Sequence, residues 1–107
     1  MVEAAKKYIV IVQLRSDSDI QRIANDCPKI IELIKGMCRN DCEQVFRSPD
    51  GTLFAYFVKT SSPSVFFRAE FEKHHATTND DKIIVLEVGE DFSAIGFSRA
   101  WTWLQHR

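Results

Sequence analysis

A chain of 107 residues is near the usual size of one domain, so we expect a single domain over residues 1–107 with one hydrophobic core. Hydrophobic residues make up 45% and charged residues 27%, which excludes wholesale disorder, and a formal charge of -1 gives no net attraction toward nucleic-acid phosphates. No stretch approaches the roughly 20 apolar residues that span a bilayer, and no secretory signal is recognisable, so a cytoplasmic protein without a membrane segment is expected.

The chain begins with a predicted strand over residues 6–14. Residues 16–19 follow it with the sequence Ser-Asp-Ser-Asp, which suits the cap of a helix. The helix is expected to begin near Ile20 and to break at Pro28, because proline lacks a backbone N–H and disfavours helical angles in the residue before it. Pro28 is then expected to open a second helix that ends near Gly36.

A β-hairpin is predicted next. A weaker strand over residues 42–47 leads into the turn sequence Ser-Pro-Asp-Gly, and a second strand covers residues 52–59. This second strand is apolar on both of its sides, as are the segments 8–14 and 82–88. A strand with two apolar sides needs cover on both, so we expect a sheet whose two faces are both covered.

The second half of the chain continues with a helix, a strand and a last helix. Ser62 and Pro63 are expected to begin the first of these helices, on which Phe67, Phe71 and His74 share one face. A polar loop separates it from the strand over residues 82–88. The C-terminal helix is expected to bury an apolar stripe made of Phe97, Ala100, Trp101 and Leu104.

The order of these elements is β-α-β-β-α-β with a C-terminal helix, which predicts an α+β protein with the ferredoxin-like fold. In that fold the first and third strands lie at the centre of a four-stranded antiparallel sheet, and both helices of the repeat cover one face. Either the C-terminal helix or a second copy of the chain would then cover the other face. We favour a homodimer formed through this face.

Residues 51–107 resemble the SinR-like small proteins, which are related to the CRISPR-associated adaptation endoribonuclease family and to VapD-type toxins. The N-terminal half follows the same pattern in outline. The matching segments are Val58-Lys59-Thr60, Phe67-Arg68 with Phe71, Asn79-Asp80-Asp81, Leu86-Glu87-Val88-Gly89 and Trp101-Thr102-Trp103-Leu104. The resemblance implies a ferredoxin-like homodimer, in agreement with the pattern of strands.

The resemblance also implies a site for a divalent metal ion at the end of the first strand, where the nuclease members carry an aspartate. This chain has Gln13 in that place, between Val12 and Leu14, and a neutral amide is a poor ligand for a hard cation. Asp17 and Asp19 lie just downstream and are the alternative metal ligands. Their simpler role is to cap the following helix, so we expect no bound metal and no cofactor.

The cysteines and histidines suggest two further kinds of site. Cys38 and Cys42 with His74 and His75 would supply four zinc ligands, and a cysteine next to a histidine would supply a nucleophile with its base. The spacing is loose, no known motif surrounds any of the cysteines, and three cysteines without an export signal are expected to remain reduced. We therefore predict no catalytic residue.

Two residues are candidates for an interface. Trp103 falls outside the apolar stripe of the last helix, so it is expected to be exposed and available for protein contacts. Tyr56 is the second candidate, since it lies among basic residues that could also bind a nucleic acid. The favoured function is a non-catalytic binding or regulatory module that acts through protein contacts; the alternative is a divergent metal-dependent nuclease or nucleic-acid-binding protein.

Overall fold

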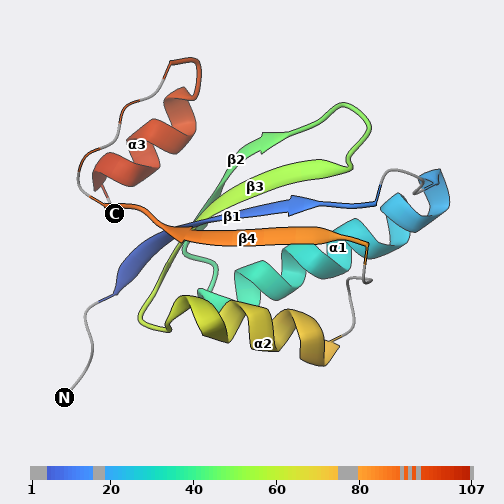
Figure 1. Cartoon of the computed structure of the whole chain (residues 1–107). Helices are drawn as coiled ribbons and strands as arrows, with labels where there is room; N and C mark the ends of the chain where they lie inside the picture. Colours follow the sequence, from blue (N-terminus) through green and yellow to red (C-terminus); the bar gives the residue numbers. More distant parts are fainter. Residues whose placement is uncertain are drawn as a thin grey trace.

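The protein is described here by a computed structural model. It describes residues 5–15, 19–74, 80–89, 91, 93 and 95–106, and these form a β-α-β-β-α-β unit followed by one helix (Figure 1). The strands are β1 (Lys6–Gln13), β2 (Cys42–Arg47), β3 (Leu53–Thr60) and β4 (Lys82–Glu87). The helices are α1 (Ile20–Met37), α2 (Ser64–His74) and α3 (Ser98–His106).

The four strands form one antiparallel sheet in the order β2-β3-β1-β4. This order and the alternation of strands and helices confirm the predicted ferredoxin-like fold. β1 and β3 lie at the centre, as the apolar pattern predicted, and they pair along their whole length from Lys6 opposite Thr60 to Gln13 opposite Leu53. β2 and β4 form the two edges of the sheet.

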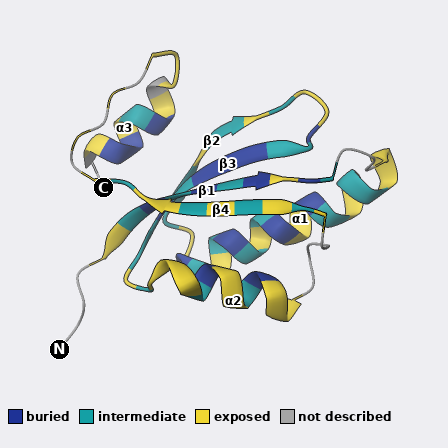
Figure 2. Ribbon diagram, in the orientation of Figure 1, coloured by how far each residue is buried: buried dark blue, intermediate teal, exposed yellow. Residues whose placement is uncertain are grey.

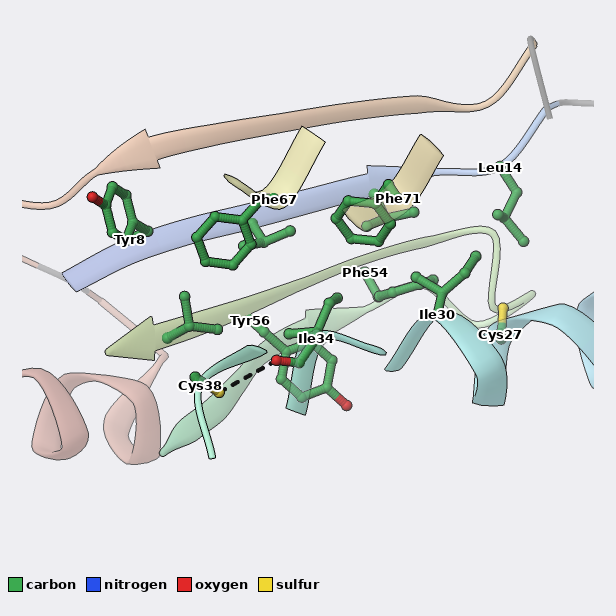
Figure 3. Close-up of a cluster of buried hydrophobic side chains, with 13 residues drawn as sticks. Tyr8, Leu14, Cys27, Ile30, Ile34, Cys38, Phe54, Tyr56, Phe67 and Phe71 are labelled. Atoms are coloured by element: carbon green, nitrogen blue, oxygen red, sulfur yellow. Dashed lines mark hydrogen bonds between the residues drawn. The ribbon is translucent and has the colours of Figure 1, made fainter. Parts of the chain in front are cut away.

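The core lies between the sheet and the two helices α1 and α2, which cover one face (Figures 1 and 3). The side chains that alternate along β1 and β3 toward these helices are almost fully buried, and the ring of Tyr8 contacts the ring of Phe67 edge-on at 5.6 Å between centroids. The core side chains that the strands contribute are Tyr8, Val10, Val12, Phe54, Tyr56 and Val58, and those from the helices include Cys27, Ile30, Ile34, Phe67 and Phe71.

Helix α1 runs without interruption through Pro28, so the predicted break is wrong. Proline removes the hydrogen bond to the carbonyl of Ala24 and its ring crowds that carbonyl, but both residues lie on the exposed side of the helix, where the carbonyl can tilt toward water. On the opposite side, Cys27, Ile30 and Ile34 are fully buried against the sheet. Burial of this face therefore keeps the helix continuous where the local sequence favours a break.

The turn between β2 and β3 confirms the predicted hairpin. The Asp50 carboxylate accepts hydrogen bonds from the Ser48 and Thr52 hydroxyls at 2.7 and 2.8 Å and from the Thr52 backbone N–H at 3.1 Å. These bonds lower the pKa of Asp50. Gly51 has a φ of +79°, and a Cβ atom there would approach Ile23 to 3.1 Å, so the turn requires glycine for its backbone angle.

The two later helices differ from the predictions in which residues they bury. α2 begins at Ser64, one residue later than predicted, and buries Phe67 and Phe71 but leaves His74 exposed. α3 buries Ala100 and Leu104, as expected, but Phe97 precedes the helix and is 42% exposed. The third buried residue is Trp103, while Trp101 of the expected stripe is only half-buried.

Candidate functional site

The most distinctive surface is the sheet face opposite α1 and α2, called here the open face. It carries Ile9 and Ile11 from β1, Phe57 from β3, and Ile84 and Leu86 from β4. Register places these residues side by side, because Ile9 lies opposite both Phe57 and Leu86, and Ile11 lies opposite Ile84. Ile84 and Leu86 are each 50% exposed (Figure 2 shows β4 largely in the colours of exposed and half-buried residues).

Helix α3 covers only one end of the open face, on the side of β2 and β3. The contacts that hold it there include the Trp103 ring, which stacks on the Phe57 ring at 6.0 Å and 8°, the Lys7 Nζ, which donates to the Leu104 carbonyl at 2.8 Å, and Arg99, which pairs with Glu43 at 3.3 Å. These contacts come from the start of β1 and from β2 and β3, and none of them involves β4. Ile84 and Leu86 remain half exposed, so cover of the segment 82–88 on this face by a second copy of the chain stays a prediction.

Trp103 is 7% exposed, so the predicted exposure of this side chain is wrong. Its stacking on Phe57 explains the burial, since an aromatic ring gains dispersion and hydrophobic energy on a flat apolar partner. Tyr56 is also 7% exposed and lies on the face covered by the helices, where its hydroxyl donates to the Gln44 side chain at 3.2 Å. Their assignment to an interface stays a prediction, and the exposed apolar residues of the open face are Ile84 and Leu86 on β4.

Only one of the two alternative metal ligands, Asp19, lies among the described residues. Asp17 lies outside them. Asp19 is the N-cap of α1, and its carboxylate accepts a hydrogen bond from the Arg22 backbone N–H at 2.7 Å, which is the capping role expected from the sequence. Gln13 is exposed at the end of β1. In the part of the chain that the structure describes, no three residues among His, Cys, Asp and Glu are grouped as metal ligands.

A charged cluster that the sequence did not predict lies close to this end of β1. The Arg22 guanidinium makes a two-point contact with the Asp81 carboxylate, through Nη1 to Oδ1 at 3.0 Å and through Nη2 to Oδ2, and its Nε donates to Asp26 at 2.8 Å. Asp81 also accepts from the Arg15 backbone N–H at 2.9 Å. The Asp81 side chain is fully buried and that of Arg22 is 12% exposed. Hydrogen bonding to Asp81 is the main reason why the pKa of Arg22 is raised.

This cluster joins three segments that are far apart in sequence: the end of β1, the first turns of α1 and the start of β4. The acidic groups are occupied by a guanidinium and a backbone N–H, so the arrangement is that of a structural ion pair. The acidic sequence near residue 80 was visible, but nothing local in the sequence indicates its pairing with Arg22.

The three cysteines are free thiols. Cys38 ends α1, is 4% exposed and donates to the Ile34 carbonyl at 3.4 Å (Figure 3), whereas Cys42 is half-buried at the start of β2. An interaction between these two thiols lowers the pKa of Cys42 and raises that of Cys38. The proposed zinc partner His74 is exposed and bonds Glu70 at 3.1 Å, and His75 lies outside the described residues.

The thiols should therefore differ in reactivity. At mildly alkaline pH, iodoacetamide is expected to modify Cys42 first, because its lowered pKa gives more thiolate and its side chain is only half-buried. Burial raises the pKa of Cys27, so Cys27 should react only on unfolding. Peptide mapping after timed alkylation measures this, with Cys42→Ser as the control. Faster reaction of Cys38, or a rate midpoint for Cys42 above about 8.5, would contradict it.

Comparisons with known proteins add no assignment to this geometry. No family model matches the chain, and neither the curated proteins nor the solved structures gave a match. Among the described helices, none has the length and apolar character needed to cross a membrane.

Proposed function

We propose that the protein is a non-catalytic binding module that forms a homodimer through the open face of its sheet. The observation that carries this proposal is the adjacency of Ile9, Ile11, Ile84 and Leu86 on one face, with the two β4 residues half exposed to solvent. Apolar side chains gathered on one sheet face favour a protein partner, because burying them removes apolar area from water. A second copy offers the same surface, as a two-fold interface requires.

The chemistry of the described residues agrees with a binding role. The Asp19 carboxylate caps a helix, and Asp26 and Asp81 are paired with Arg22, so these groups have structural uses. A relationship to the SinR-like proteins remains part of the proposal, and it would imply a homodimer. A cytoplasmic setting is part of it too, since three free thiols suit a reducing compartment.

Two variants with the same kind of substitution test the proposal by sedimentation velocity. The natural chain is expected to sediment with twice its mass of 12.3 kDa. Ile84→Lys with Leu86→Lys should give a monomer, because two charges would have to be buried in the interface. The matched control is Ile20→Lys, since Ile20 is 86% exposed at the start of α1, and it should leave the dimer intact.

Two kinds of result would overturn the proposal. The first concerns the dimer: the natural chain remains a monomer at all concentrations, or Ile20→Lys weakens the dimer as much as the double variant does. The second is metal-dependent cleavage of RNA or DNA by the natural chain that is lost in Asp17→Ala or Asp19→Ala, which would establish the nuclease alternative.

A further inference from the structure

The hydrogen bonds of the sheet determine which backbone N–H and C=O groups of β4 face outward, away from β1. The Val88 N–H donates to the Lys7 carbonyl at 2.8 Å, and Tyr8 lies opposite Glu87, so Lys7 and Val88 form a hydrogen-bonded pair. Hydrogen-bonded and non-bonded pairs alternate along an antiparallel ladder. The pairs of Ile9 with Leu86 and of Ile11 with Ile84 are therefore the bonded ones.

It follows that Ile83, Val85 and Glu87 direct their backbone N–H and C=O groups away from β1. The pairing of β1 with β3 agrees with this pattern. The Leu14 N–H donates to the Thr52 carbonyl at 2.8 Å, so the even-numbered residues of β1 make their backbone hydrogen bonds to β3. The odd-numbered residues of β1 therefore make theirs to β4. β4 ends the sheet, so its three outward residues present donors and acceptors with the spacing that an added strand requires.

A groove runs beside this edge, between β4 and α2 (Figure 1 shows α2 beneath β4). Its volume is about 440 Å³. Val65 from α2 is 65% exposed and lies in the groove with Ile83 and Val85, which are half-buried. The lining residues are Ser64, Val65, Arg68, Phe71, Glu72, Asp81, Ile83, Ile84 and Val85.

The charges of the groove indicate the chemistry of its occupant. Arg68 and Glu72 pair with each other at 3.2 Å on α2, and both side chains are largely exposed. Their charges offset one another, and Asp81, which also lines the groove, is paired with Arg22, so the groove offers no net attraction for an acidic or a basic ligand. Selection there rests on apolar contacts and on main-chain hydrogen bonds, and the second of these requires an extended polypeptide backbone.

We propose that the groove between α2 and β4 binds an extended, uncharged polypeptide segment with apolar side chains, which adds to the edge of β4 as a fifth strand. Alternate side chains of that segment enter the groove beside Ile83 and Val85, and the others extend the open face beside Ile84 and Leu86. A second copy pairing edge to edge through β4 is the competing occupant, and a peptide scan and the Val85→Pro variant separate the two.

The probe is a displayed library of random peptides of about a dozen residues, selected against the full chain. Enriched sequences are synthesised with a fluorescent label, and their affinity is measured by polarisation. Each peptide is then scanned with N-methyl groups, one backbone nitrogen at a time. Strand addition predicts a loss of about tenfold or more at every second position, where the N–H would face β4, and little change at the positions between.

The protein variant Val85→Pro gives an independent test. It removes an outward N–H and leaves the bonds to β1, so the sheet should stay folded by circular dichroism while affinity for the peptides falls about tenfold or more. An N-methyl scan without a period of two, unchanged binding by Val85→Pro, or the absence of any enriched peptide would each overturn the proposal. The proposal would also be overturned if the chain bound no peptide but self-associated, and if Val85→Pro abolished that self-association. Dimerisation through Ile84 and Leu86 is measured separately, so either proposal can fail alone.

Discussion

Replacing Asp81 by alanine is expected to lower the free energy of unfolding by about 3–5 kcal/mol. The Asp81 side chain is fully buried and makes a two-point contact with Arg22, whose own side chain is 12% exposed. Removing the carboxylate takes the two-point partner from a guanidinium with little access to water, which keeps its Nε contact with Asp26, and it takes the acceptor from the Arg15 backbone N–H that donated to Asp81. Urea unfolding followed by circular dichroism measures the loss.

The matched control for Asp81→Ala is Arg68→Ala. Arg68 also pairs with a carboxylate, but its side chain is 81% exposed and that of Glu72 is 68% exposed, so this change should cost at most about 1 kcal/mol. The double variant Arg22→Ala with Asp81→Ala should be less destabilised than the sum of the single variants, because removing both partners leaves no buried charge. A cost below about 1 kcal/mol for Asp81→Ala would contradict the structural role of the pair.

Phe67→Ala is the second change expected to have a large effect, again about 3–5 kcal/mol. Phe67 has no exposed surface, and its ring meets that of Tyr8 edge-on at 5.6 Å, so it joins α2 to the centre of the sheet. Alanine would keep the helix propensity but leave a cavity that the central strand and the helices cannot fill without moving.

Val65→Ala on the same helix provides the comparison for Phe67→Ala. Val65 is 65% exposed, so its truncation should change the stability by about 0.5 kcal/mol or less. Equal losses for the two variants in urea unfolding would mean that α2 is not anchored through its Phe67 face.

The features that the sequence predicted correctly depend on local signals. The alternation of apolar residues along β1 and β3, the Ser-Pro-Asp-Gly turn and the order of the elements are each visible within a few residues, and together they determine the topology. Asp19 as a helix cap is a local signal of the same kind.

The features that were predicted wrongly or missed depend on contacts between distant segments. Pro28 should break an isolated helix, but the buried side of α1 keeps it continuous. The periodicity of α3 alone predicts an exposed Trp103, but its stacking partner Phe57 lies on β3, more than 40 positions earlier in the chain. The pairing of Arg22 with Asp81 spans 59 positions, and no spacing rule indicates it.

The open face is the surface through which the chain is proposed to make its principal contact. The most direct test is a dilution series of the uniformly labelled protein, followed by the amide resonances in nuclear magnetic resonance spectra. Dimerisation through this face predicts concentration-dependent shifts centred on Ile9, Ile11, Ile84 and Leu86, and unchanged resonances on the exposed sides of α1 and α2. Spectra that do not change with concentration, or shifts centred on the helices, would contradict it.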